Sequence, residues 1–244
     1  MKGYILIYLL LYSINVLSQE QGFISKMMLF DYSLQIPATK MANEFGLNSS
    51  MGLCYLNNKN EVLFGIDANF MFGNNVKNDS ILRLISTHEG YLINSSGELD
   101  EVLLYQRGIN THLLIGKSFR NQEDNLSGLY IYGGVGYLQH KIKLETDRTY
   151  LPQLDDDYMK GYDNFTSGLS TKLCVDYMHF DKNTSIKYHV GIEFINGFTS
   201  SKRAYNFSDM MEGENITKLD QLVGIRFGVI IPINRSNQGK FHYF

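Results

Sequence analysis

The histidines are the first residues whose type suits acid–base chemistry, because an imidazole titrates near neutral pH. The candidates are His88, His112, His140 and His189. A lipid-modifying enzyme would pair one of them with a serine nucleophile and a carboxylate. The sequence has no G-x-S-x-G motif and no serine in a recognisable nucleophile context. We therefore expect a chain that is not an enzyme and uses no cofactor, with a structural role for His189.

A run of three aspartates is a weak candidate for a metal site. Asp155, Asp156 and Asp157 follow one another, with Asp163 and Glu145 nearby. Divalent cations such as Ca²⁺ take several oxygen ligands, which an acidic loop can supply. The spacing does not match the alternating acidic positions of an EF-hand. A solvated external loop explains the run equally simply, and we favour that interpretation.

The two cysteines, Cys54 and Cys174, fall in the second and sixth of the segments described below. Their positions place both on the polar, inward face. Strands so far apart around a barrel place the two thiols on different walls, so we expect free thiols rather than a disulfide.

Charged side chains recur on the polar face of segments that are otherwise apolar. Acidic and basic residues both occur there, which allows them to pair inside a narrow barrel. This predicted charge network of the lumen consists of Asp31, Glu61, Asp67, Lys172, Asp176, Lys187, Glu193, Lys218, Asp220 and Arg226.

The elements that must position these charges show a period of two residues, which indicates β-strands. Segment 61–73 shows it best: Val62, Phe64 and Ile66 share a face with further apolar residues, and Glu61 and Asp67 lie on the other. Its length of about 13 residues is near that of a tilted membrane strand. The predicted strands lie within 24–36, 47–55, 61–73, 103–116, 129–140, 169–177, 186–198 and 218–231.

The links between these segments alternate between short and long. The shorter links are expected at 57–60, 118–127 and 181–184, and the long polar loops at 37–46, 74–100, 141–164 and 199–215. Short periplasmic turns alternating with longer external loops are typical of outer-membrane barrels. The sequence therefore predicts an all-β fold, an eight-stranded antiparallel up-and-down transmembrane β-barrel.

A soluble eight-stranded barrel is the main structural alternative, since its strands alternate too. In that case the polar face would be outside, where its many glycines would weaken the strands for no gain. Inside a narrow barrel, the same glycines make room for long charged neighbours. An eight-stranded interior is just wide enough for side chains to fill it. We therefore expect a filled, non-conducting lumen and an aromatic-rich face in lipid.

The ends of the chain and its composition indicate where it resides. Residues 1–18 combine Lys2 with a short apolar run and read as a cleaved signal peptide, so the barrel would span 19–232. Residues 233–244 would form a short C-terminal periplasmic tail. A formal charge of −3 without a basic cluster gives no sign of a nucleic-acid partner. The expected location is the outer membrane, with membrane lipid as a partner.

Several segments resemble outer-membrane β-barrel proteins of the Bacteroidota. They are 64–77, 134–142, 160–163, 191–194, 202–207 and the ending 241–244. The resemblance covers most of the mature chain and implies a small eight-stranded barrel in the outer membrane of a diderm bacterium. It implies little chemistry. Related small barrels look like accessory subunits of secretion or barrel-assembly machines.

Three functions follow as hypotheses. The first is a structural or accessory subunit of an envelope complex for secretion or barrel assembly. The second is an adhesion or surface-interaction barrel that acts through loops 74–100 and 141–164. The third is a lipid-modifying enzyme, which the absence of a recognisable catalytic set disfavours.

Overall fold

The computed structural model describes residues 24–122, 125–146, 151–180, 187–213 and 216–233. The expected signal peptide at 1–18, residues 234–244 of the expected tail and the turn at 181–184 therefore lie outside the described residues.

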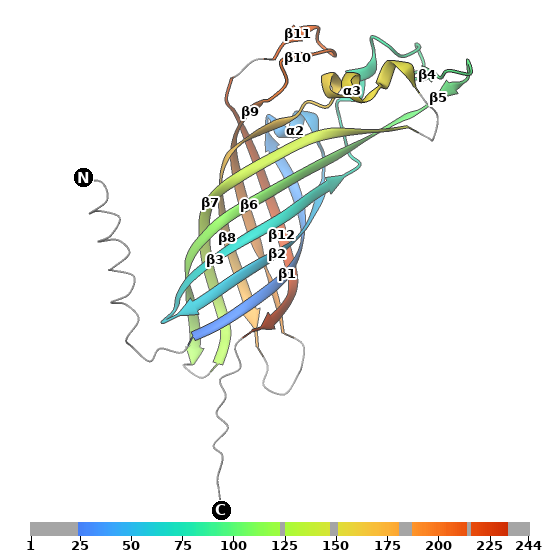
Figure 1. Cartoon of the computed structure of the whole chain (residues 1–244). Helices are drawn as coiled ribbons and strands as arrows, with labels where there is room; N and C mark the ends of the chain where they lie inside the picture. The colour runs from blue at the N-terminus through green and yellow to red at the C-terminus, as the bar shows by residue number, and fades with distance from the viewer. Residues whose placement is uncertain (1–23, 123–124, 147–150, 181–186, 214–215, 234–244) are drawn as a thin grey trace, which may run out of the picture.

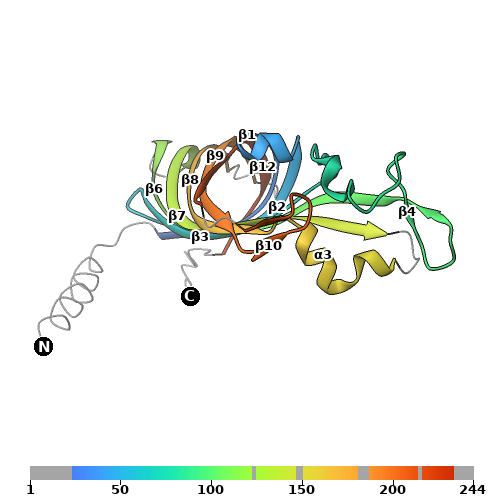
Figure 2. The same ribbon diagram turned by 90° about the horizontal axis from the view of Figure 1, so that it is seen from above.

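The molecule is a closed antiparallel barrel of eight strands, as the sequence predicts. Each barrel strand pairs with the next one along the chain, and the last closes on the first (Figures 1 and 2). The strands are β1 (Ile24–Thr39), β2 (Asn48–Lys59), β3 (Val62–Gly73), β6 (Val102–Gln122), β7 (Asn125–Thr146), β8 (Thr166–His179), β9 (Tyr188–Ser201) and β12 (Lys218–Pro232).

Alternating side chains give the wall its two faces, because successive residues of a strand point to opposite sides. In β1, Phe30 and Ile36 lie outside with 46% and 63% of their surface exposed, whereas Asp31 and Ser33 are buried inside. Strand β7 is the exception in composition. Its inward face carries large side chains, including Tyr130, which is fully buried.

The interior is layered, with two apolar clusters in addition to the expected charge network. At the end where β2 turns into β3, Met27, Leu29 and Leu56 belong to one buried apolar cluster. At the opposite end, Met41 and Phe45 belong to a second. The buried charged residues lie between the two clusters along the strands. Apolar side chains therefore close the lumen at both ends, and charges occupy its middle.

Several expected links overlap the strands, which are longer than their apolar patterns suggest. Strand β2 continues to Lys59, inside the expected link 57–60, and the largest differences are in β6 and β7. Residues 118–127 were expected to be a link, but β6 continues to Gln122 and β7 begins at Asn125. At the other end, β7 continues to Thr146, so the first part of the expected loop 141–164 is strand. In the β7 extension the outward residues Lys141 and Lys143 are charged, and Ile142 and Leu144 point inward into the apolar cluster at the mouth, so the apolar face is the reverse of that in the wall.

The long connections contain small elements. They are α2 (Met41–Glu44), η1 (Asp79–Leu82), β4 (Leu92–Ile93), β5 (Leu99–Asp100), η2 (Pro152–Leu154), α3 (Asp156–Tyr162), β10 (Tyr205–Asn206) and β11 (Met211–Glu212). Among the described residues, no helix is long and apolar enough to cross a membrane.

We call η1, β4, β5, η2 and α3, with the hairpin β10–β11, the platform. Figure 2 shows that α3 and β4 lie beside the barrel mouth rather than over it. Hydrogen bonds connect the parts of the platform. Gln153 donates a hydrogen bond to the carbonyl of Ile93, and the backbone N–H of Phe207 donates to the carbonyl of Gly161. The short helix α2, in contrast, contacts β1 and β12 at the mouth.

Candidate functional sites in the lumen and on the outer wall

The centre of the lumen is a buried ion-pair group around Lys172. Its Nζ lies 2.6 Å from Oδ2 of Asp67 and 3.1 Å from Oε2 of Glu193. Gln35 extends the group by donating a hydrogen bond to Glu193 at 2.7 Å. Strands β1, β3, β8 and β9 each supply one of these four side chains. Their meeting therefore depends on barrel closure.

A second ion-pair group surrounds Arg226 of β12. Its Nη2 lies 2.6 Å from Oδ2 of Asp31, and its Nε lies 3.8 Å from Oδ1 of Asp176. The guanidinium also donates to Sγ of Cys174 at 2.9 Å and lies 5.8 Å from the ring centre of Tyr132. The Tyr132 hydroxyl donates to Asp176. The two terminal nitrogens of this buried arginine therefore have hydrogen-bond partners, whereas its Nε has only the longer contact with Asp176.

Glycines, which have no side chain, make room for these two ion-pair groups. A Cβ at Gly191 would lie 2.0 Å from Oδ1 of Asp176, and one at Gly228 would lie 2.6 Å from Nε2 of His189. That His189 atom is itself 2.7 Å from Oδ1 of Asp31. The structural role that we expect of His189 is consistent with this contact. Glycine on the inward face therefore provides space for charged neighbours.

Nearer the platform, Asp220 lies 2.9 Å from Nε2 of His140 and accepts a hydrogen bond from Thr199. The ring of Phe45 packs edge-on against His140, with 5.5 Å between ring centres. Glu44 lies beside them on α2, and burial raises the pKa of its carboxyl above the ordinary value. This group joins the charged layer to the apolar closure at the mouth.

Three residues assigned to the lumen network lie elsewhere, because the strand ends place them outside the charged layer. Glu61 lies in the turn between β2 and β3, and its half-exposed side chain is 3.7 Å from Nζ of Lys117. Lys187 is half-buried and precedes β9, and half-buried Lys218 is the first residue of β12. The lumen groups contain the remaining members: Asp31, Asp67, Lys172, Asp176, Glu193, Asp220 and Arg226.

The structure also brings together a serine, a histidine and an aspartate that sequence reasoning missed. Oγ of Ser170 is 2.8 Å from Nε2 of His112, whose Nδ1 is 3.2 Å from Oδ1 of Asp67. This order of contacts matches that of a hydrolase triad. However, the three side chains are only 1–2% exposed, and Asp67 is also paired with Lys172. No strand pattern could have revealed the trio, since three different strands supply it.

The other candidates are placed as follows. Cys54 and Cys174 are both buried free thiols, as expected. The aspartate run lies at Asp155 and the start of α3, where exposed Asp157 pairs with Lys160 at 2.7 Å. Within the part of the chain that the structure describes, no group of three His, Cys, Asp or Glu side chains is arranged to hold a metal ion. His88 is exposed in the connection between η1 and β4.

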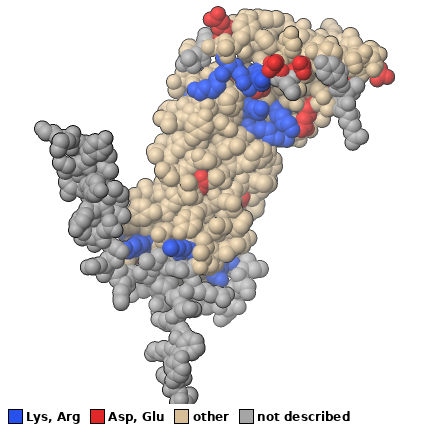
Figure 3. All heavy atoms as spheres, in the orientation of Figure 1, with Lys and Arg blue, Asp and Glu red and all other residues tan. Residues whose placement is uncertain are grey.

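The outer wall is apolar in its middle and carries charged side chains at both ends, with acidic residues beside the cations at the upper end. Figure 3 shows a nearly uncharged tan surface between blue Lys and Arg atoms beneath the platform and at the lower end. On β6, Leu113 and Ile115 are 65% and 59% exposed, and on β8 Leu169 is 74% exposed. Exposed apolar areas of this extent are unusual on soluble monomers.

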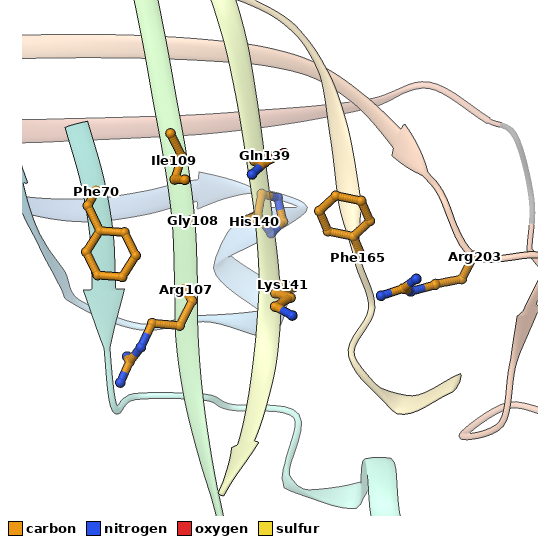
Figure 4. A pocket seen from close by; sticks show the side chains of 9 residues that line it. All are labelled: Phe70, Arg107, Gly108, Ile109, Gln139, His140, Lys141, Phe165 and Arg203. Atoms are coloured by element: carbon orange, nitrogen blue, oxygen red, sulfur yellow. The ribbon is translucent and has the colours of Figure 1, made fainter. Parts of the chain in front are cut away.

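An open cavity of about 290 Å³ lies on this wall where the apolar surface meets the upper cations. Figure 4 shows Phe70 and Arg107 on one side of it, Phe165 and Arg203 on the other, and Lys141 between them. Strands β3, β6 and β7 supply three of these residues. The cavity is thus built across neighbouring strands.

Comparisons with known proteins leave the family open. No protein-family profile matches the chain, and no curated protein sequence is significantly similar. Among solved structures, the chain is similar to Ail, the attachment invasion locus protein of Yersinia pestis, solved with the heparin analogue sucrose octasulfate. The identity is 9%, with 87% of this chain and 100% of that chain covered and a TM-score of 0.33. The outer-membrane protein OprG from Pseudomonas aeruginosa gives 12% identity, 87% and 98% coverage and a TM-score of 0.38.

Proposed function

We propose that the chain is a non-enzymatic, non-conducting outer-membrane barrel that serves as an interaction scaffold through its platform. The apolar outer wall supports the membrane location, because side chains such as Leu113 and Val135 would otherwise be 65% and 64% exposed to water. Closure supports it as well, since a closed ring leaves no strand edge unpaired in lipid.

The height of the apolar wall supports the same proposal. On β6, outward-facing Arg107 and Lys117 are about ten residues apart, with Ile109, Leu113 and Ile115 exposed between them. At roughly 3.3 Å per residue and a tilt of about 40°, that separation corresponds to roughly 25 Å across the membrane. The apolar band of outer-membrane barrels has about this height.

The filled lumen supports the proposal that the barrel does not conduct solutes. Fully buried Arg226, Tyr130 and Tyr132 occupy the interior, and an apolar cluster closes each end. With no open passage, the barrel offers its external surface for function. The long connections meet at one end of the barrel, and they build the platform there.

Exposed apolar residues on the platform are the observation that carries the interaction role. Ile93 and Leu99 on the β4–β5 hairpin are 49% and 58% exposed, and Tyr158 on α3 is 56% exposed. Such residues lie beyond the wall and outside the lumen, so neither lipid nor the core accounts for them. An accessory subunit docked to an envelope complex for secretion or assembly would cover them.

Adhesion to an external surface is a second candidate, favoured by the same platform because it belongs to the long-loop end of the barrel. Purification from mildly solubilised membranes after crosslinking separates the two. For the accessory role, one envelope protein should co-purify with the wild type and with the control Glu98→Gln. The double variant Ile93→Ser/Leu99→Ser should lose it.

The adhesion candidate predicts a different pair of results. The barrel should purify alone, and cells displaying it should bind an external surface unless Ile93 and Leu99 are changed. A barrel that purifies alone and confers no surface binding would contradict the scaffold proposal. In each case, heat-dependent migration on gels reports whether the variant barrel has folded.

The buried Ser170–His112–Asp67 trio allows a test of the proposal that the barrel is not an enzyme. Ser170 is 2% exposed inside the filled lumen, so a substrate has no route to its hydroxyl. A fluorophosphonate probe should leave the folded barrel unlabelled. Labelling that disappears in Ser170→Ala, together with altered membrane lipids in cells lacking the gene, would favour the enzyme hypothesis instead. We also propose membership of the Bacteroidota barrel family, on the sequence resemblance alone.

A further inference from the structure

We propose that the outer wall beneath the platform holds a lipid of the outer leaflet by a phosphate monoester in its headgroup. The site is the cavity lined by Phe70, Arg107, Ile109, Lys141 and Arg203, among others. This inference rests on the proposed membrane location and goes beyond it by assigning a ligand class to a particular patch of wall.

The first observation is a pair of like charges. Arg107 of β6 and Lys141 of β7 are directly opposite each other in the strand register, and both point outward. Like charges directly opposite in a sheet destabilise it. Arg107 donates to the carbonyl of Gln106 at 2.8 Å and lies 4.9 Å from the ring centre of Tyr105. Its charge also acts on the carboxylate of Glu145, which is itself paired with Lys143. An anion bridging the two cations would relieve this repulsion.

The second observation is how few carboxylates the patch contains. Asp163 forms a two-pronged hydrogen-bonded pair with Arg203, which raises the pKa of that arginine further. Nζ of Lys141 is 4.0 Å from the same carboxylate, a longer separation than in the Arg203 pair. Within the described part of the chain, Arg107 has no such ion pair. The patch therefore keeps a net positive charge beside a fixed, oriented arginine.

The third observation is the apolar floor of the cavity. Phe70 and Ile109 are each 42% exposed on the wall, and Phe165 lies 5.2 Å from the guanidinium carbon of Arg203. The cations lie at one edge of the cavity: in Figure 4, Arg107 and Lys141 are drawn below Phe70 and Ile109, on the side toward which the arrow of β3 points. A ligand that fits is charged at one end and apolar at the other. A free anion gains nothing from contact with an apolar floor, whereas the acyl chains of a lipid can pack against it.

Charge selects among lipids. A phosphate monoester carries about −1.5 to −2 charges and three acceptor oxygens near neutral pH. Two opposed cations match that charge, and arginine can bind phosphate with two parallel hydrogen bonds. A zwitterionic headgroup has a phosphodiester that its own ammonium neutralises, so it fits less well. We therefore expect a preference for lipids that end in a phosphate monoester.

Native mass spectrometry of the folded, full-length mature protein tests the site, with diphosphoryl lipid A and its phosphate-free counterpart as probes. The wild type should retain the diphosphoryl lipid and should not retain the phosphate-free one. The variant Arg107→Gln/Lys141→Gln should retain it at least tenfold less. Lys117→Gln is the matched control, because it removes an outward cation at the opposite end of the same strand and should change nothing.

Three results would overturn the proposal. They are equal retention by the double variant, equal retention of the phosphate-free lipid, and complete displacement of the lipid by millimolar inorganic phosphate. Flotation with phospholipid vesicles is measured in parallel. Protein that floats without lipid selectivity contradicts this site alone, whereas protein that does not float contradicts the proposed membrane location.

Discussion

Lys172 shows how single residues decide the stability of this barrel. Its ammonium is 2.6 Å from Asp67 and 3.1 Å from Glu193, and all three side chains are nearly inaccessible to water. Removing charges from water is costly, so a buried ion pair adds little net stability compared with a well-packed apolar core. Removing only one partner is different, because the remaining charges lose both their water and their counterion.

We therefore expect Lys172→Met to lower the free energy of unfolding by about 3–5 kcal/mol, as for other broken buried pairs. Urea titration of the vesicle-inserted barrel, followed by circular dichroism, measures the change. Lys117→Met is the control, since its partner Glu61 is 3.7 Å away and both side chains are about half exposed. The control should change stability by about 0.5 kcal/mol or less. Equal losses in both variants would contradict the buried network.

Glu44 gives a prediction for pH. Burial raises the pKa of its carboxyl in the folded barrel, and its Oε2 is buried without a hydrogen-bond partner among the described residues. The folded state therefore holds the proton more tightly than the unfolded state does. Stability should fall as the pH rises from the ordinary carboxyl pKa of 4.5 through the raised value.

Glu44→Gln removes this titration. The variant should be more stable than the wild type at pH 7. The difference should vanish as the pH falls well below 4.5, where the Glu44 carboxyl is protonated in both the folded and the unfolded chain. Urea titrations at several pH values measure it. A gain that is the same at pH 4 and pH 7 would show that packing, and not charge, is responsible.

At the scale of the strand, space matters as much as charge. Gly191 of β9 lies against β8, where an added Cβ would be 2.0 Å from Oδ1 of Asp176 and 2.3 Å from the carbonyl oxygen of Val175. Gly191→Ala should therefore destabilise the barrel by about 1–3 kcal/mol, the usual cost of overpacking. Gly224→Ala is the matched comparison, because its nearest neighbours are 3.1 Å away, and it should cost less. The reverse order in urea titrations would contradict the crowding.

The strands were predictable from sequence because lipid-facing and lumen-facing residues alternate, and apolar side chains mark one of the two faces. Exposed Phe30 and buried Asp31 follow this rule. In β7 the rule fails, because Tyr130 and Tyr132 point inward and aromatic residues suit either face. The upper end of β7 was also missed, because its outward residues Lys141 and Lys143 are charged while inward-facing Ile142 and Leu144 are apolar, which reverses the pattern of the wall.

The candidate sites were less predictable than the strands. Alternation placed Asp67 and Lys172 on the inward face, but their 2.6 Å contact depends on how β3 and β8 are staggered around the ring. Glu61 was misplaced because it continues the odd-numbered, inward-facing positions of β3 in sequence, but it lies in the turn before that strand and does not point inward. The outer cavity was missed for another reason: opposition of Arg107 and Lys141 is a property of strand register, which spacing within one segment does not contain.

For the molecule as a whole, the layered interior predicts an absence of conductance. The apolar clusters around Leu56 at one end and Phe45 at the other exclude water from the passage. The purified barrel in a planar bilayer should show no stepwise currents at moderate voltage. Its insertion is checked by flotation with vesicles from the same preparation. Regular channel openings in inserted wild-type protein would contradict the filled lumen.

The seam between the first and last strands has a consequence for assembly. Strands β1 and β12 pair from Met27 with Pro232 to Thr39 with Asp220. Asp31 and Arg226, separated by 195 positions, form their ion pair across the same seam. Until the final strand arrives, a growing sheet would expose both an open edge and unpaired charges to lipid. Insertion should therefore be all-or-none, because the ring closes only when β12 pairs with β1.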